Sequence, residues 1–268
     1  MPHPVHLTTR IARRLCAVGV SAFALISCAT TSHTSSTGMG AGATGAEAAA
    51  TMPRPAAARI GNDIRWFRSS AEQRAAFLQA YRVAGERLVA LSEGRSRGTW
   101  GVILDADETV LDNSRYQQER ALVDSGYTEA SWSRWVARRE ATALPGSLTF
   151  IRNVQTRGGR VAIVTNRTAA ECDDTRANLR AEGIEADVVL CKAETSDKNP
   201  RFAQVAAGVN GLPPLEVIMW IGDNIQDFPG MAQVPMRAAP ESAYADFGRR
   251  FVLLPNPMYG SWERNPLP

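Results

Sequence analysis

The chain has 268 residues, enough for one sizeable domain with a small insertion, and its 44% hydrophobic and 21% charged residues are ordinary for a globular protein. Three of its 30 Lys and Arg residues lie in residues 1–27, which contain no acid, so the remaining 27 basic residues match the 27 acidic ones. This balance gives no support for binding to nucleic acid.

The three histidines, at positions 3, 6 and 33, all precede the part of the chain that we expect to fold. Their positions argue against a Ser-His-Asp triad, a phosphohistidine mechanism and a His-ligated zinc site in that part. Catalysis there would depend on carboxylates, Lys, Arg, hydroxyls and an oxygen-ligated metal. The two lysines, Lys192 and Lys198, lie close together. Either this is chance in an Arg-biased chain, or one of them does what a guanidinium cannot do.

Residues 1–27 have the pattern of a secretory signal peptide, because arginines precede an apolar stretch over residues 15–27. That stretch is shorter than the roughly 20 apolar residues of a transmembrane helix. Residues 25–28, Leu-Ile-Ser-Cys, resemble a bacterial lipobox, which implies lipidation of Cys28. The alternative is an ordinary signal peptide with a coincidental cysteine. Residues 28–59 are rich in Thr, Ser, Gly and Ala and are predicted to form a flexible tether.

The folded part is predicted to begin with a helix, because apolar residues recur every three or four positions between Phe77 and Leu91. Capping-box spacing at residues 69–72 and a glycine at position 94 indicate its ends, and its aromatic residues are expected in the core. Residues 100–104 form a short apolar run typical of a buried strand in a parallel sheet.

The rest of the chain alternates between helices and strands. Residues 110–145 contain no clean strand and one helical segment at 131–140. Helices are predicted at 147–156, 168–183 and 199–208, and strands at 160–165, 187–190, 215–221 and 251–254. This alternation predicts an α/β fold with a mainly parallel sheet.

Two aspartates, Asp105 and Asp107, follow the first predicted strand directly. Residues two apart on an extended backbone point to the same side, so both carboxylates can face one pocket. Two anions this close repel one another, which calls for a cation or a shared proton. Asp223 and Asp227 follow another predicted strand and add two hard oxygen donors. Such a set suits Mg²⁺.

Thr165 and Lys198 follow two further strands, the second after a short loop. Ligands of α/β sheets bind beyond the carboxyl ends of the strands, so these groups are expected in one pocket. Asp105 could attack phosphorus and Asp107 could transfer the proton. The ammonium and the hydroxyl could bind the phosphate oxygens.

Cys172 is predicted early in a helix and Cys191 at the end of the following strand. An even pair in an oxidising compartment could form a disulfide, and the alternative is two buried thiols.

The order of these motifs resembles the haloacid dehalogenase (HAD) superfamily. More closely, it resembles the bacterial lipoprotein e and class C acid phosphatase (5′-nucleotidase) family. The similar segments are residues 105–114, 164–167, 196–198, 201–202, 222–224, 227–228, 247–251 and 255–263. The resemblance covers about residues 66–263, nearly the whole folded part.

This resemblance implies a HAD-like, Rossmann-like phosphatase domain over residues 60–268, with helices on both faces of the sheet and a small helical cap at about 113–150. It implies Asp105 as the nucleophile and Asp107 as the acid/base. Mg²⁺ would be held by the Asp105 carboxylate, the Asp107 backbone carbonyl and Asp223, with support from Asp227.

The resemblance also implies which residues contact the substrate. Thr165, Asn166 and Lys198 would bind phosphate. Trp132 matches a family aromatic that stacks on the substrate base, and Tyr259 is a second candidate. Trp135 is expected in the core. Members of the family hydrolyse phosphomonoesters, often nucleoside 5′-monophosphates or nicotinamide mononucleotide.

The leading hypothesis is therefore a lipid-anchored, Mg²⁺-dependent phosphomonoesterase of the cell envelope, in the outer membrane facing the periplasm or the surface. One alternative is a phosphotransferase of the same superfamily, which would need a larger cap. Another is a surface lipoprotein that binds haem or nucleotides without turnover. Family members can be homodimers, but no feature of this sequence indicates a dimer face.

Overall fold

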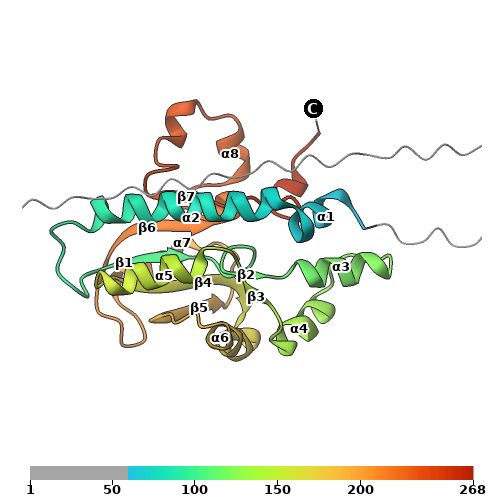
Figure 1. The fold of residues 1–268 in the computed structure, drawn as a ribbon, viewed down its shortest axis with the longest axis horizontal. Coiled ribbons are helices and arrows are strands. Elements are labelled where there is room, and N and C mark those ends of the chain that lie inside the picture. The colour runs from blue at the N-terminus through green and yellow to red at the C-terminus, as the bar shows by residue number, and fades with distance from the viewer. Residues whose placement is uncertain (1–59, 268) are drawn as a thin grey trace, which may run out of the picture. The chain divides into compact units, whose positions relative to one another are not determined.

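The computed structural model describes residues 60–267 and places a sheet of five parallel strands at its centre (Figure 1). The strand order is β5-β4-β1-β6-β7. The bounds are β1 Trp100–Leu104, β4 Arg160–Thr168, β5 Val188–Lys192, β6 Glu216–Gly222 and β7 Phe251–Leu253. The predicted signal peptide, Cys28 and the tether lie outside the described residues.

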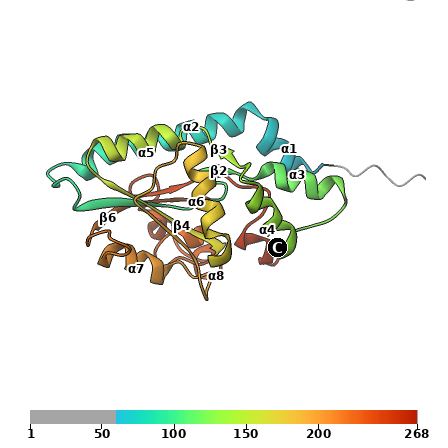
Figure 2. The ribbon, with the colours of Figure 1, turned by 90° about the horizontal axis from the view of Figure 1, so that it is seen from below.

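Helices cover both faces of this sheet (Figures 1 and 2). Val102 and Leu104 of β1 belong to one apolar cluster, and Ile103 between them belongs to another. Side chains alternate across a strand, so β1 contributes to a core on each side. The first face packs against α2 (Ala71–Ser92), α5 (Ser147–Thr156) and α6 (Cys172–Ala181), and the second against α7 (Asn199–Ala207).

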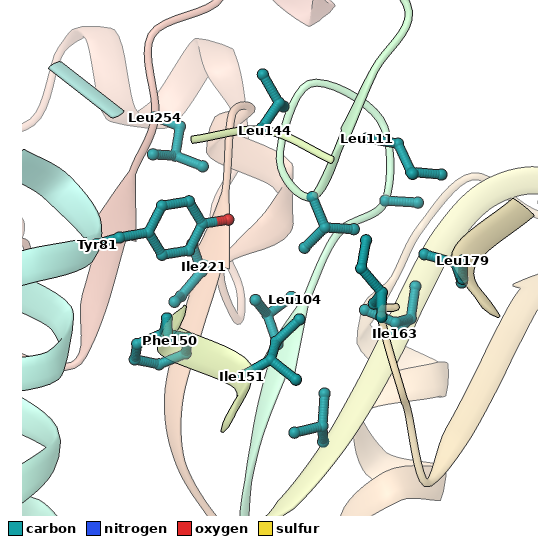
Figure 3. Packing of buried hydrophobic residues seen from close by; sticks show 14 of the residues in the cluster. Tyr81, Leu104, Leu111, Leu144, Phe150, Ile151, Ile163, Leu179, Ile221 and Leu254 are labelled. Atoms are coloured by element: carbon teal, nitrogen blue, oxygen red, sulfur yellow. The ribbon is translucent and has the colours of Figure 1, made fainter. Parts of the chain in front are cut away.

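Figure 3 shows the first core, where Tyr81 and Phe150 from the helices face Leu104 and Ile163 from the strands. The prediction that the aromatic residues of α2 are core residues is confirmed, because Phe77 and Tyr81 are buried. The α/β fold with a mainly parallel sheet and helices on both faces is also confirmed.

Most predicted elements lie where the pattern placed them, with small shifts at their ends. β1 and α5 have their predicted bounds. α2 begins one residue later than the capping spacing suggests, because the hydroxyl of Ser70 accepts the backbone N–H of Gln73 at 3.0 Å. β4 continues to Thr168, beyond its predicted end. The sequence analysis missed α1 (Asn62–Ser69), which packs against α2.

The insertion after β1 is built from two short strands and two helices, so the prediction of a single helix in residues 110–145 is wrong. β2 (Leu111–Asp112) pairs antiparallel with β3 (Thr142–Ala143), and α3 (Ser114–Leu122) and α4 (Glu129–Arg138) lie between them. α3 and α4 lie beyond the end of the sheet at which β1 finishes (Figure 1). α5 packs on β4 and α2, so the inserted part as observed ends near residue 143.

The carboxyl-terminal part of the described chain is mostly short turns of helix. They are α8 Gln233–Arg237 and the 3₁₀ segments η2 Ile225–Asp227, η3 Glu241–Tyr244 and η4 Ser261–Arg264. A further 3₁₀ segment, η1 Ala169–Glu171, lies earlier, between β4 and α6. None of the helices in residues 60–267 combines the length and the hydropathy that a membrane span requires.

A disulfide joins Cys172, the first residue of α6, to Cys191 in β5. The sequence left this pairing open. The bond ties α6 to the end of β5, just before the loop that leads to Lys198.

We predict that the double variant Cys172→Ser/Cys191→Ser loses about 3 kcal/mol of unfolding free energy, because a crosslink of this loop length restricts the unfolded chain. The sequence separation is 19 residues. Urea unfolding with and without dithiothreitol measures the change. Reduced wild type should unfold at the midpoint of the variant, and the variant should not respond to the reductant. Equal midpoints for the oxidised wild type and the variant would refute the prediction.

Candidate active site

Three neighbouring strands bring the candidate catalytic groups to one edge of the sheet. Asp105 follows β1, Asp223 follows β6, and Thr165 lies in the last part of β4. The register pairs Leu104 with Ile163 on one side and with residue 221 on the other. The polar groups therefore begin from adjacent positions at the carboxyl edge, where α/β sheets bind ligands.

A cluster of three carboxylates forms at this edge. Asp105, Asp223 and Asp227 each offer one oxygen, and the three oxygens lie within 4.8 Å of one another. Asp227 is in η2, and its Oδ2 accepts the backbone N–H of Asn224 at 2.9 Å. A Cβ at Gly222 would lie 2.3 Å from the Asp227 side chain, so this close approach requires glycine.

Lys198 lies against the cluster and is almost fully buried, with 3% of its side chain exposed. Its Nζ is 2.5 Å from Oδ1 of Asp105 and 2.6 Å from Oδ1 of Asp227. Burial opposes the charge of the ammonium, but Asp105 and Asp227 outweigh burial and raise the pKa of Lys198. The lysine is therefore a fixed positive charge that bridges two of the three acids.

Lys198 does not fully neutralise the negative charge of the three acids. Burial raises the pKa of Asp105 to about 7, with the charges of Asp227 and Asp107 adding to the effect and Lys198 opposing it. Burial also raises the pKa of Asp223, and Asp227 and Asp105 add to that shift. A bound divalent cation would oppose this repulsion. The donor set of three hard oxygens fits such a cation.

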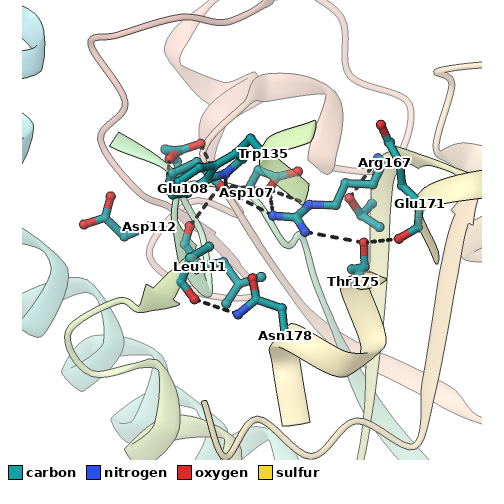
Figure 4. A network of polar contacts seen from close by, with 12 residues as sticks. Asp107, Glu108, Leu111, Asp112, Trp135, Arg167, Glu171, Thr175 and Asn178 are labelled. Atoms are coloured by element: carbon teal, nitrogen blue, oxygen red, sulfur yellow. Dashed lines mark hydrogen bonds and ion pairs between the residues drawn. The ribbon is translucent and has the colours of Figure 1, made fainter. Parts of the chain in front are cut away.

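Asp107 is held apart from this cluster, although it lies only two residues from Asp105. Its Oδ1 accepts Nε of Arg167 at 2.9 Å and Nδ2 of Asn113 at 2.8 Å (Figure 4). Its carboxylate is not among the clustered oxygens that could hold a metal in the described residues. The two aspartates of the motif therefore have separate partners.

The three residues expected to bind phosphate lie in different environments. The hydroxyl oxygen of Thr165 is buried and accepts the backbone N–H of Arg167 at 3.1 Å, which leaves its proton free to donate. Asn166 is exposed, and its side-chain oxygen accepts Nη2 of Arg201 at 2.7 Å. Arg201 also donates to the carbonyl of Thr165. Lys198 is the third, and its ammonium lies against Asp105.

The two tryptophans of α4 differ in burial. Trp135 is buried in the core, where its Nε1 donates to Oδ1 of Asn113 at 2.8 Å, so that prediction is confirmed. Trp132 is only partly buried, and its ring packs edge-on against Tyr116 at 5.1 Å between centroids. Tyr259, also partly buried, donates its hydroxyl proton to the carboxylate of Glu108.

Sequence reasoning missed several residues that hold the site together. Glu108 is fully buried in a left-handed backbone conformation with φ 52°, and burial raises its pKa. Its Oε1 accepts the backbone N–H of Asn113 at 2.7 Å. Asn256 donates to Oδ2 of Asp223 at 2.8 Å. These residues, like Arg167 and Arg201, lie inside the motif segments, but nothing in a linear pattern indicates which partner each one reaches.

Comparisons with known proteins agree on one family. The family model described as HAD superfamily, subfamily IIIB (acid phosphatase) matches residues 20–262. The class C acid phosphatase from Bacillus anthracis is 30% identical, with a TM-score of 0.68 over 75% of this chain and 85% of that chain. Its crystal structure with tungstate bound gives 29% identity and a TM-score of 0.67 over the same shares of the two chains.

We predict that Asn256→Ala weakens the binding of Mg²⁺ or Mn²⁺ by about 10- to 100-fold, because hydrogen bonds to metal-binding carboxylates orient them. Isothermal titration of the metal-free protein measures the affinity. Asn265→Ala is the matched control, since Asn265 donates instead to Gln233 at 3.0 Å in the same carboxyl-terminal segment. An unchanged affinity in Asn256→Ala, or an equal loss in both variants, would contradict the prediction.

Proposed function

Because the chain belongs to the acid phosphatases of HAD subfamily IIIB, we propose that it hydrolyses small phosphomonoesters with Mg²⁺ as cofactor and an aspartyl-phosphate on Asp105 as intermediate. Nucleoside 5′-monophosphates and nicotinamide mononucleotide are the proposed substrates. Because it belongs to this family, the chain is a hydrolase of phosphoric monoesters.

The observation that supports this proposal most strongly is the position of Lys198 between Asp105 and Asp227. A phosphate that approaches Asp105 brings two negative charges to a carboxylate. The buried ammonium provides positive charge at that point, where the charge of the transition state also lies. Mg²⁺ held by Asp105, the backbone carbonyl of Asp107 and Asp223, with support from Asp227, would supply further positive charge as a Lewis acid.

Asp105 and Asp107 then have separate roles in the reaction. A carboxylate oxygen of Asp105 forms a bond to phosphorus while the bond from phosphorus to the leaving oxygen breaks, and Asp107 gives that oxygen a proton. In the second half, Asp107 takes a proton from water, and the water oxygen bonds to phosphorus. The bond from phosphorus to Asp105 breaks, and inorganic phosphate leaves.

Two further observations support the proposed substrates. The Bacillus anthracis relative was solved with tungstate bound, and tungstate is a tetrahedral oxyanion like phosphate. Trp132 is partly exposed on the inserted helix α4 and lies near Arg167, which contacts Asp107. Stacking of a substrate base on this ring would contribute on the order of 1–3 kcal/mol.

The proposed location at the cell envelope rests on the sequence of residues 25–28, through a lipid on Cys28. Residues 28–59 would then act as the tether between the lipid and the phosphatase domain.

We predict that Asp105→Asn lowers phosphate release from a nucleoside monophosphate by at least about 1,000-fold, because the amide cannot act as the nucleophile. EDTA should abolish the activity of wild type, and added Mg²⁺ should restore it. Asp187→Asn is the control, since Asp187 pairs with Arg160 at 2.8 Å, away from the acid cluster. An inert wild type in Mg²⁺ would refute the proposed function, and an active Asp105→Asn variant would refute the nucleophile.

We predict that Lys198→Ala lowers kcat/KM by roughly 100- to 1,000-fold, or about 3–4 kcal/mol, because it removes a fixed positive charge from the transition state. Lys192→Ala provides the matched control, since the half-buried Lys192 makes no contact with Asp105 among the described residues. Circular dichroism confirms that both variants fold. A loss of less than about tenfold in Lys198→Ala would count against this role.

A further inference from the structure

We infer that Arg167 is the positioning residue for proton transfer: it holds Asp107 so that Oδ2 alone gives the proton to the leaving group and takes it from water. The inference rests on the proposed function, because it concerns the acid/base of the same reaction.

The first observation is the shape of the ion pair between Arg167 and Asp107. Arg167 lies in β4, with 1% of its side chain exposed. Both Nε and Nη2 reach the same oxygen, Oδ1 of Asp107, at 2.9 and 2.8 Å. A bidentate fork would usually place one nitrogen on each carboxylate oxygen. Here the guanidinium occupies one oxygen and leaves the other free.

The second observation is that Oδ1 is saturated. Nδ2 of Asn113 donates to it at 2.8 Å and Nε of Arg167 at 2.9 Å, and Nη2 of Arg167 lies in ion-pair contact at 2.8 Å. Within residues 60–267, no side chain or backbone group donates a hydrogen bond to Oδ2 of Asp107. A group that approaches Oδ1 would have to displace donors that already point at it, whereas Oδ2 can be reached without displacing a donor.

The third observation is that the guanidinium itself cannot rotate freely. Its Nη2 donates to Oδ1 of Asn113 at 3.0 Å, and its Nη1 donates to Oγ1 of Thr175 at 3.4 Å (Figure 4). The Thr175 hydroxyl is fixed in turn by donating to the carbonyl of Glu171 at 2.8 Å. Contacts from the cap insertion and from α6 therefore hold the arginine, and the arginine holds the acid/base.

The same guanidinium also meets the proposed substrate contact. Its carbon lies 5.6 Å from the centre of the Trp132 ring, a distance at which a cation is attracted to the face of an indole. Arg167 thus contacts both Asp107 and the ring on which a substrate base would stack. When a substrate base stacks on Trp132, Arg167 therefore sets the position of the leaving oxygen relative to Oδ2 of Asp107.

If Arg167 positions Asp107, the rate loss of an Arg167 variant depends on the leaving group of the substrate. A purely structural role for Arg167 would not produce this dependence. A nucleoside alkoxide needs the proton from Asp107 when the bond to phosphorus breaks, whereas p-nitrophenolate leaves without one. Both substrates need Asp107 as a base to hydrolyse the aspartyl-phosphate. Misplacing Oδ2 should therefore slow both half-reactions for the nucleotide and only the second for the aryl phosphate.

The experiment compares rapid-mixing kinetics of wild type, Arg167→Met and Arg167→Lys on a nucleoside 5′-monophosphate and on p-nitrophenyl phosphate in Mg²⁺. We expect the loss of nucleotide hydrolysis to exceed the loss of first-turnover nitrophenolate release by about 100-fold. Both variants should release about one nitrophenolate per enzyme in a burst, followed by slow turnover. Arg167→Lys keeps the buried charge, so it can be measured if Arg167→Met does not fold.

Arg138→Met is the matched control, because Arg138 also stacks on a tryptophan, at 4.7 Å from the ring of Trp135, and pairs with acids of the cap. It does not contact Asp107 and should show neither the burst nor the substrate difference. Equal losses on both substrates, to within about threefold and with no burst, would overturn the role of Arg167. Wild type that is inert on both substrates would instead refute the proposed function.

Discussion

The site depends on one constraint: the carboxylates gathered at the carboxyl edge of the sheet must be compensated by positive charge. Asp105, Asp223 and Asp227 present oxygens within 4.8 Å of one another. Charges removed from water are costly unless they are paired. Lys198 provides one fixed compensating charge, and the remaining repulsion creates a place for a divalent cation. In the proposed mechanism, a phosphate would approach Asp105 where both positive charges meet it.

The sheet makes this arrangement possible because two neighbouring strands deliver the acids: Asp105 follows β1, and Asp223 and Asp227 follow β6. β1 lies in the middle of the order β5-β4-β1-β6-β7, so Asp105 has β4 on one side and β6 on the other. The insertion between β2 and β3 then brings Asn113 over Asp107. The motif's two aspartates therefore have different partners, Lys198 for Asp105 and Arg167 for Asp107.

The sequence was sufficient to predict the fold class, the sheet strands and the groups that follow their ends, because buried strands have a simple apolar pattern. It could not predict β2 and β3, which are two residues each and carry no periodicity. It also could not assign partners to Glu108, Asn113 or Asn256, since their contacts depend on how the insertion and the carboxyl-terminal segment fold back. Arg167 was visible in a motif, but its contact with Asp107 through two nitrogens on one oxygen appears only in the structure.

The most direct test of the central claim is chemical trapping of the nucleophile. The enzyme turning over a phosphomonoester in Mg²⁺ is treated with borohydride, which reduces an aspartyl-phosphate to homoserine, and the peptide that contains Asp105 is sequenced by mass spectrometry. We expect homoserine at position 105 only when substrate is present. Rapid phosphate release with an unmodified Asp105, or with homoserine at another aspartate, would contradict the assignment of Asp105 as the nucleophile.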